Sequence, residues 1–231
     1  MTPWRTMRKV TLGLVLLGLM FGANPAESGT VPDHVSAHEA NWWLATGLGA
    51  GALSPDQSLA DYRWETGPTA LYALQAIAGR GRFATGLRLS RWATTQGTGL
   101  GSSESDPRVG LTQLDLIGQF RLVEFAGFQF WGSALVGRVN MSYTPDHLLI
   151  DTGVPGQDIV VDYKPITETS LGLGLEIKRD FGRRLTAAVV AERATFSLDT
   201  SHRRGSEIVS ERQQFVNWSL RLQVSWVLDL G

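Results

Sequence analysis

The end of the chain carries the pattern that most constrains its fold. Because successive residues of a β-strand face opposite sides, residues 218–230 form a strand with one apolar face and one mostly polar face. Thirteen residues can cross a bilayer at a tilt of about 45°, and a tryptophan stands near each end of the apolar row. The segment is therefore predicted to be a transmembrane β-strand. Its apolar row consists of Trp218, Leu220, Leu222, Val224, Trp226, Leu228 and Leu230.

The start of the chain has the order of a secretory signal peptide. Three basic residues precede the apolar run 10–22, and the small residues Ala23 and Ala26 follow it. The run is too short for a transmembrane helix, which needs about 20 apolar residues. We expect cleavage after Ala26, which assigns residues 1–26 to the signal peptide, 27–40 to a polar periplasmic lead-in and 41–231 to the folded domain.

Charge and cysteine content narrow the range of partners. No acidic residue precedes Glu27, so removal of residues 1–26 with their three basic side chains changes the formal net charge from −1 to −4. This acidic balance argues against nucleic acid as a partner. The chain has no cysteine, which excludes disulfides and a lipid anchor on cysteine.

Seven earlier segments repeat the same alternation, and the connections between the eight segments alternate between long and short. Transmembrane barrels have short periplasmic turns and long extracellular loops, with both termini in the periplasm when the strand number is even. The sequence therefore predicts an all-β fold, an eight-stranded antiparallel up-and-down transmembrane β-barrel that follows a cleavable signal peptide. The seven connections are expected at residues 54–67, 79–82, 96–107, 124–127, 144–165, 179–184 and 199–213.

The third long connection, residues 144–165, has a strand pattern of its own. Apolar residues at 148–150 and 159–161 flank the turn-forming cluster 152–157. We therefore expect the two neighbouring barrel strands to continue above the membrane as a protruding hairpin. The exposed edge of such a hairpin can recruit a partner strand. This segment is the candidate site for a surface ligand.

Charged residues fall on the face opposite the apolar one. Four basic and four acidic residues are expected to point inward, and buried charges in a narrow barrel must be paired. The balance favours a plugged polar lumen over a narrow pore for ions or small solutes. The predicted network contains Arg88, Asp115, Arg121, Glu176, Lys178, Glu192 and Arg221, with Asp229 as the fourth acid.

Tryptophans near strand ends are interpreted as an aromatic girdle at the two membrane interfaces. Trp64 falls in the first long connection and is the exception. No metal or cofactor is expected, because neither His34 and His38 nor the acids of residues 146–162 match a binding motif. The girdle is predicted to consist of Trp42, Trp43, Trp92, Trp218 and Trp226.

With these patterns, residues 42–230 resemble the small eight-stranded outer-membrane proteins of the OmpA-barrel and OmpX type and the wider opacity-type barrel superfamily. The resemblance implies location in the bacterial outer membrane, contact with outer-membrane lipid and lipopolysaccharide, and insertion by the barrel-assembly machinery. Members of this class usually end in an aromatic residue, whereas this chain ends in Leu230-Gly231.

The leading hypothesis is a non-enzymatic outer-membrane barrel that acts in envelope integrity or surface interaction through its loops. One alternative is a soluble exported carrier of the lipocalin kind, whose calyx is apolar and whose outer surface is polar. Another is a lipid A acyl hydrolase, for which Ser201 and His202 are formally available and His147 is the other extracellular histidine. The pore described above is the third alternative.

Overall fold

A computed structural model describes residues 41–97, 106–150, 159–204 and 207–230. The predicted signal peptide and periplasmic lead-in lie outside this part of the chain. Across the described ranges, no helix is both long and apolar enough to cross a membrane. The elements are β1 Trp42–Ser54, the 3-10 helix η2 Gln57–Tyr62, β2 Thr69–Arg80, β3 Phe83–Thr95, β4 Arg108–Phe125, β5 Phe128–Thr144, β6 His147–Ile150, β7 Ile159–Asp162, β8 Ile166–Phe181, β9 Leu185–Arg204 and β10 Glu207–Asp229.

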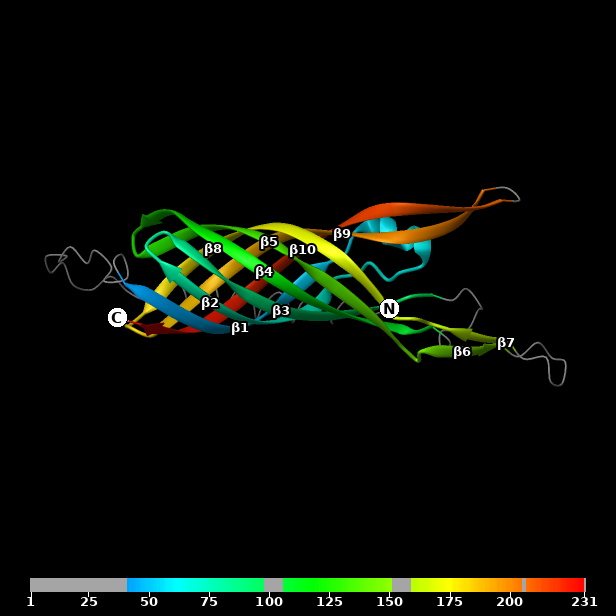
Figure 1. Ribbon diagram of the computed structural model, residues 1–231, viewed down its shortest axis with the longest axis horizontal. Helices are drawn as coiled ribbons and strands as arrows, with labels where there is room; N and C mark the ends of the chain where they lie inside the picture. Colours follow the sequence, from blue (N-terminus) through cyan, green and yellow to red (C-terminus); the bar gives the residue numbers. More distant parts are fainter. Residues whose placement is uncertain (1–40, 98–105, 151–158, 205–206, 231) are drawn as a thin grey trace, which may run out of the picture. The chain divides into compact units, whose positions relative to one another are not determined.

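Eight of the strands form one closed antiparallel barrel in the order β1-β10-β9-β8-β5-β4-β3-β2 (Figure 1). Following paired residues around the barrel from Leu44 leads back to β1 at Ser54, ten positions further along. This stagger corresponds to strands tilted by about 40° from the barrel axis. The predicted fold class is confirmed, and β10 closes the barrel against β1.

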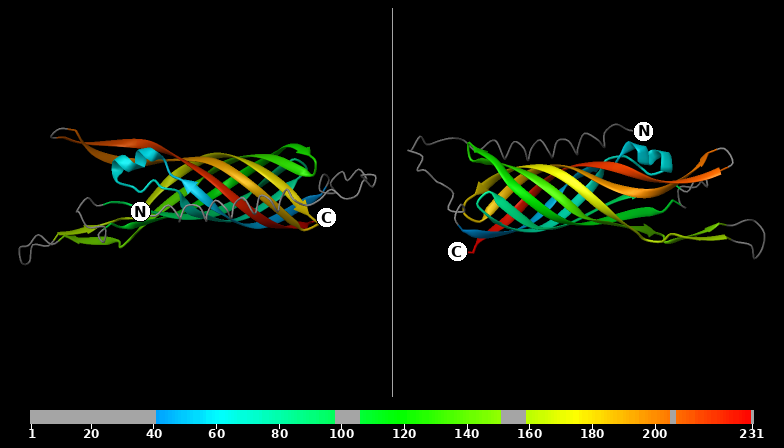
Figure 2. Two further views of the ribbon diagram at one scale, coloured as in Figure 1. Left: turned by 180° about the vertical axis from the view of Figure 1, so that it is seen from behind. Right: turned by 45° about the horizontal axis from the view of Figure 1, so that its top comes forward.

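The short connections all lie at the end of the barrel that holds Trp42 and Asp229 (Figure 2). Each tight turn contains a glycine with positive φ, namely Gly81, Gly127 and Gly182. L-residues with a Cβ rarely adopt this backbone conformation, so glycine permits the abrupt reversal of the chain. The alternation of long and short connections therefore places all three tight turns at the same end of the barrel as the start of β1 and the end of β10.

Two hairpins project from the opposite end of the barrel. The predicted hairpin within 144–165 is present as the separate two-stranded sheet β6-β7, and Tyr163 N donates to Asp146 O at 2.7 Å to extend its ladder. It is not continuous with β5 and β8, because Pro145 and Pro165 stand at the two junctions and supply no backbone N–H.

The other projecting hairpin, formed by β9 and β10, differs from the sequence prediction. Residues 199–213 were expected to form a polar loop, but β9 and β10 remain paired as far as Arg204 and Glu207. The prediction ended both strands where polar residues begin, because strands inside a membrane have an apolar face. A β-ribbon that extends into water can carry polar residues on both faces. The last connection is therefore a long β-hairpin.

The outer surface of the barrel carries an apolar belt. Large apolar side chains point outward on every strand and stay exposed, as in Leu48, Leu87 and Leu173 at 69%, 55% and 68%. The inward residues at this level include many polar ones and glycines, such as Gln75, Arg88 and Asp115, alongside a few apolar ones such as Ile117 and Val190. This arrangement suits a barrel that is surrounded by lipid and has a polar lumen.

The chemistry of the two faces reverses towards the loop end. On β3 the outward residues change from Leu89 to Arg91, and on β5 they change from Val136 to Arg138. The inward residues beyond this level are apolar and form one buried cluster with two residues of the first loop. The strands therefore leave the membrane here and continue as a barrel with a polar outside and an apolar inside. The cluster consists of Leu53, Leu59, Trp64, Leu71, Trp92, Val109, Leu111, Val139, Met141, Phe196, Leu198 and Phe215.

Candidate functional site

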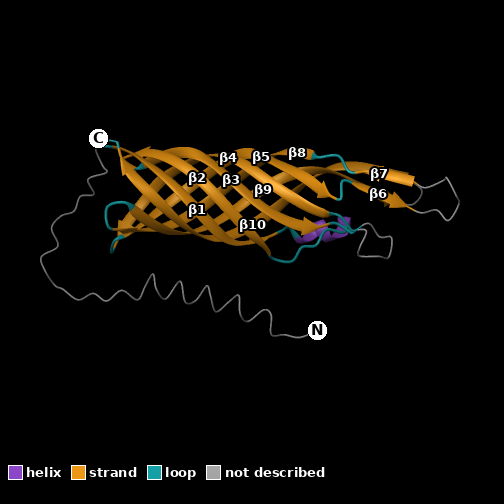
Figure 3. Ribbon diagram, turned by 90° about the horizontal axis from the view of Figure 1, so that it is seen from below, coloured by secondary structure: helices purple, strands orange, loops and turns teal. Residues whose placement is uncertain are grey.

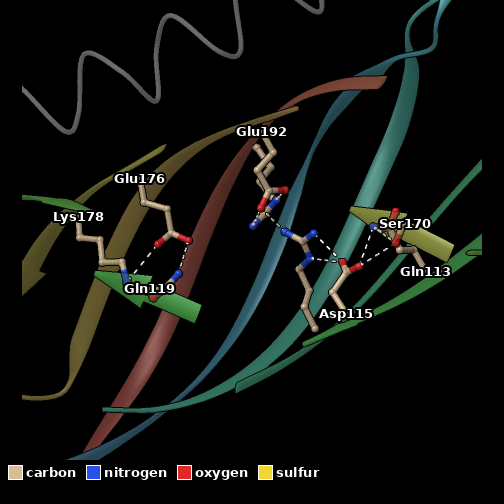
Figure 4. A network of polar contacts seen from close by, with 9 residues as sticks. Gln113, Asp115, Gln119, Ser170, Glu176, Lys178 and Glu192 are labelled. Carbon is tan, nitrogen blue, oxygen red and sulfur yellow. Dashed lines mark hydrogen bonds and ion pairs between the residues drawn. The ribbon is translucent and has the colours of Figure 1, made fainter. Parts of the chain in front are cut away.

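The centre of the lumen holds an ion-pair layer (Figure 4). The Arg88 guanidinium on β3 pairs with Asp115 on the neighbouring β4, with Nη2 at 2.7 Å from Oδ2, and also with Glu192 on β9. Because β3 and β9 are four strands apart in an eight-stranded barrel, the second pair crosses the lumen. Arg221 on β10 also donates to Glu192. Two cations and two carboxylates thus bridge opposite walls.

This layer is closed to water. The four charged side chains are between 0% and 5% exposed, and Gln113 and Ser170 donate to Asp115 Oδ1 at 2.7 and 3.3 Å. A cavity of about 20 Å³ lies between the layer and the apolar cluster, which is room for one water molecule. The space is too small for a continuous water-filled path.

Glycines on the inner face make room for these side chains. A Cβ added to Gly137 would lie 2.2 Å from Leu114 O and 2.3 Å from Asp115 Oδ1. A Cβ added to Gly51 would lie 2.5 Å from the Cα of Arg221. The charged layer fits into a narrow barrel because the neighbouring strand offers no side chain at these points.

A second polar group lies nearer the tight turns (Figure 4). Lys178 Nζ is 3.1 Å from Glu176 Oε2 and donates to Gln119 Oε1 at 2.9 Å. The Arg121 guanidinium is 3.3 Å from Glu124. All seven residues of the predicted polar network therefore point inward and have ion-pair partners, whereas Asp229 is exposed at the end of β10.

Two aromatic rings close the lumen at the tight-turn end. The rings of Trp43 on β1 and Trp131 on β5 meet edge to face, with centroids 6.4 Å apart, and β1 and β5 are on opposite sides of the barrel. Lys178 Nζ lies 4.4 Å from the centre of the Trp131 ring. Ile77 and Ala84 pack against the same group.

The structure corrects two members of the predicted aromatic girdle. Trp43 points into the lumen, and Trp92 is 5% exposed inside the apolar cluster. Both were assigned to the exterior because they lie near strand ends, but their parity on the strand places them inside. Trp42, Trp218 and Trp226 point outward and are 52%, 58% and 49% exposed, as an interface girdle requires.

The first loop lies at the other end of the barrel, where Figure 3 shows its 3-10 helix, and it covers the apolar cluster there. It was expected to be a polar loop, but η2 places Leu59 and the following Trp64 in the apolar cluster at 2% and 6% exposure. Tyr62 Oη donates to Gln213 Oε1 at 2.7 Å, and Glu65 N donates to Thr95 O at 2.8 Å. The loop is thereby attached to β10 on one side and β3 on the other.

Asp56 is the main attachment of this loop to β10. Its carboxylate accepts hydrogen bonds from Ser58 N at 2.9 Å, Ser58 Oγ at 2.7 Å and Val216 N at 2.8 Å. Burial alone would raise the pKa of the Asp56 carboxyl, but the hydrogen bonds from Ser58 and Val216 outweigh it and hold the pKa below its usual value. The ionised form therefore caps both η2 and the edge of β10.

The hairpin β6-β7 presents apolar side chains to solvent. Leu149, Ile159 and Val160 are 60%, 53% and 58% exposed, and consecutive residues of β7 point to opposite faces. Within the described ranges, the sheet has two strands and no third one pairs with either edge. The hairpin therefore offers exposed apolar surface together with free strand edges.

The residues considered for catalysis do not form a described catalytic group. His147 Nδ1 lies 2.9 Å from Asp146 Oδ1, both side chains are exposed, and no described serine hydroxyl is hydrogen-bonded to this histidine. The side chains of Ser201 and His202 lie outside the described residues. In the described part of the chain, no group of three His, Cys, Asp or Glu side chains is arranged to hold a metal ion.

The apolar belt also bears on the lipocalin-like alternative. A carrier of that kind has an apolar calyx and a polar exterior, whereas at the level of the belt this barrel is apolar outside and charged inside. The largest apolar part of the interior lies above that level, where the first loop fills it, and a smaller apolar group with Ile77 and Trp131 lies near the tight turns. The structure therefore contradicts the carrier hypothesis.

No protein-family model and no curated protein sequence matches the chain. Among solved structures, it is similar to Neisserial surface protein A, with 8% sequence identity, a TM-score of 0.51, and coverage of 80% of this chain and 96% of that one. It also aligns with the outer membrane protein AlkL, at 16% identity and a TM-score of 0.45, over 90% of this chain and 97% of that one. The alignment with OprG from Pseudomonas aeruginosa has 9% identity and a TM-score of 0.45 and covers 83% of this chain and 97% of that one. The chain has the fold of the small outer-membrane β-barrels, in agreement with its expected location in the bacterial outer membrane.

Proposed function

We propose that this protein is a sealed, non-enzymatic outer-membrane barrel that presents the hairpin β6-β7 to an extended segment of a partner protein at the cell surface. The observation that carries the proposal is the hairpin itself, whose apolar side chains and strand edges are exposed. An incoming strand that pairs with one edge would satisfy backbone groups and cover part of this apolar surface.

The closed lumen supports a role at the surface over one in transport. Three layers fill the barrel between its two ends: the first loop with the apolar cluster, the ion-pair layer, and the Trp43–Trp131 pair. Each layer joins strands on different sides of the barrel. The parts that remain available to a partner are therefore at the loop end.

Site-specific photo-crosslinking in living cells tests this proposal. A photoreactive amino acid placed at Leu149 or Val160 is expected to give one discrete adduct, because both side chains are exposed on the hairpin. The same amino acid at Gln214, on the exposed face of β10, is the matched control and should give none. Absence of an adduct at all three positions, or the same adduct at Gln214, would contradict the proposal.

Deletion of the hairpin separates surface binding from envelope integrity. Replacement of residues 146–163 by a short Gly-Ser linker removes the proposed binding site and should leave the permeability of the envelope to a hydrophobic dye unchanged. If removal of the hairpin raises permeability as much as removal of the whole protein, then the role is in envelope integrity and the proposal is wrong.

A further inference from the structure

Three arginines mark the level at which the apolar belt ends. Arg91, Arg138 and Arg193 point outward on β3, β5 and β9, and all three are exposed. Each is the first charged outward residue beyond the belt on its strand, after Leu89, Val136 and Ala191 in turn. The three cations therefore stand at the membrane boundary on the loop side of the barrel.

These arginines have no acidic partner among the described residues. By contrast, the guanidinium of Arg179 at the tight-turn end lies 5.1 Å from the Phe128 ring and 5.8 Å from the Phe181 ring. Arg212, further out on β10, pairs with both Glu168 and Asp199. Arg179 and Arg212 thus have partners, whereas the three arginines at the boundary have none among the described residues.

Exposed aromatic rings stand beside two of the three. Tyr72, which is 63% exposed, is the cross-strand partner of Arg91, and Trp218, which is 58% exposed, is the partner of Arg193. Aromatic rings with one polar end prefer the headgroup zone of a bilayer, and arginines at this depth direct their charge out of the hydrocarbon. The arginines and the aromatic residues therefore place the lipid headgroups at the same level of the barrel.

Arg91 and Arg138 lie close enough to act on one headgroup. Their strands β3 and β5 flank β4, so the two strand axes are about 10 Å apart. The β4 residues between them are Thr112, the cross-strand partner of Arg91, and Leu114, the cross-strand partner of Arg138, and neither is charged. Two guanidinium groups can therefore approach the same phosphorylated molecule from either side of β4.

We propose that Arg91, Arg138 and Arg193 bind the phosphate groups of lipid A in the outer leaflet, with Arg91 and Arg138 forming the principal site. The loop end of an outer-membrane barrel faces the outside of the cell, so its headgroup level is that of the phosphorylated glycolipid. Charge complementarity supports this occupant, because the arginines have no acidic partner in the part of the chain that the structure describes. The inference depends on the outer-membrane location but is independent of the hairpin's partner.

Binding to lipid A in reconstituted vesicles tests the site. The full chain is refolded into phosphatidylcholine vesicles, and binding of fluorescent diphosphorylated lipid A is compared with that of fully dephosphorylated lipid A. The variant R91Q/R138Q should bind the diphosphorylated form roughly 25-fold more weakly, since each arginine near a membrane surface contributes about fivefold. Heat-modifiable mobility on gels confirms that each variant is folded.

Arg108→Gln provides the matched control. Arg108 is also an exposed outward arginine, but it lies three outward positions beyond Leu114 on β4, above the boundary. R108Q removes the same charge and should leave lipid A affinity within about twofold. Equal weakening in R108Q would show that net charge alone is involved and would overturn the assigned site.

The lipid comparisons separate the remaining outcomes. Equal affinity of the wild type for dephosphorylated lipid A would refute phosphate recognition. Competition by phosphatidylglycerol as strong as that by lipid A would show a general site for anionic lipid and contradict the assignment to lipid A. Because the assay contains no partner protein, its failure is distinct from failure of the hairpin crosslinks.

Discussion

Substitution of Glu192 by glutamine should destabilise the barrel severely. Glu192 is the carboxylate that pairs with both Arg88 and Arg221 in the centre of the lumen. In E192Q, Arg88 keeps Asp115, but Arg221, at 1% exposure, keeps no acidic partner among the described residues. A buried charge left without its partner costs about 3 to 5 kcal/mol, which sets the expected loss in free energy of unfolding.

The companion variant distinguishes a charge effect from a simple packing effect. R221Q leaves Glu192 paired with Arg88, so it should cost about 1 to 3 kcal/mol. The double variant E192Q/R221Q restores the charge balance between Arg88 and Asp115 and should be more stable than E192Q alone. E124Q is the control, because the Glu124 side chain is 43% exposed at the tight-turn end and its pair contributes about 1 kcal/mol or less.

Urea unfolding in lipid vesicles, followed by tryptophan fluorescence, measures these differences. E192Q should lower the free energy of unfolding by several times the effect of E124Q, and the second substitution, R221Q, should recover part of the loss. An E192Q barrel within about 1 kcal/mol of the wild type, or a double variant no more stable than E192Q, would refute the reasoning.

Three further predictions concern the wall, the lumen and the first loop. Leu222→Arg should cost about 2 to 4 kcal/mol in vesicles because it places a charge on the lipid-facing side, and Gln223→Leu tests the polar lumen beside it; tolerance of L222R in urea unfolding would contradict the assigned faces. Gly137→Ala should prevent the folded gel mobility or lower the stability by more than about 2 kcal/mol, since its Cβ would overlap backbone and carboxylate oxygens. Because the pKa of Asp56 is lowered in the folded protein, the stabilisation of the first loop by its carboxylate is complete above the unfolded pKa of about 3.8 and is lost as the pH falls through the folded pKa. Quenching of Trp64 fluorescence by acrylamide, measured against W64F, should therefore rise only in acid. In D56N this quenching should be high and independent of pH, and a D56N profile equal to the wild type would show that the carboxylate does not hold the loop.

Local patterns in the sequence predicted the barrel wall. Alternation along residues 218–230 fixed which side chains of β10 face lipid, and the glycine-containing connections gave the tight turns at Gly81, Gly127 and Gly182. These features depend on the period of a strand and on φ at single residues, so they can be read without knowledge of the tertiary structure. The inward position of Arg88 and Glu192 follows from the same parity.

The sequence did not predict where each strand leaves the membrane. Beyond Leu89 and Val136 the outward face becomes polar and the inward face apolar, and this change depends on height within the tilted barrel. Trp92 was assigned to the outer girdle because it lies near the end of β3, although its parity on the strand points it into the apolar cluster. A signal was present in Val139 and Met141, which place apolar residues on the inward parity of β5 just above the belt.

The burial of the first loop also required tertiary information. Leu59 and Trp64 are single apolar residues within a polar segment, which by itself is typical of an exposed loop. They are buried because the apolar cluster at the end of the barrel offers a surface to cover. The specific ion pairs across the lumen likewise depend on which strands oppose each other, which is known only once the barrel is closed.

Conductance of the wild-type protein in planar lipid bilayers tests the sealed lumen most directly. The three layers joined across the barrel predict that the folded protein, verified by its gel mobility, gives no conductance steps above the bare bilayer in 1 M KCl at about 100 mV. Reproducible steps from the folded wild type, with an amplitude that changes in E192Q, would show an open path through the ion-pair layer and contradict the account.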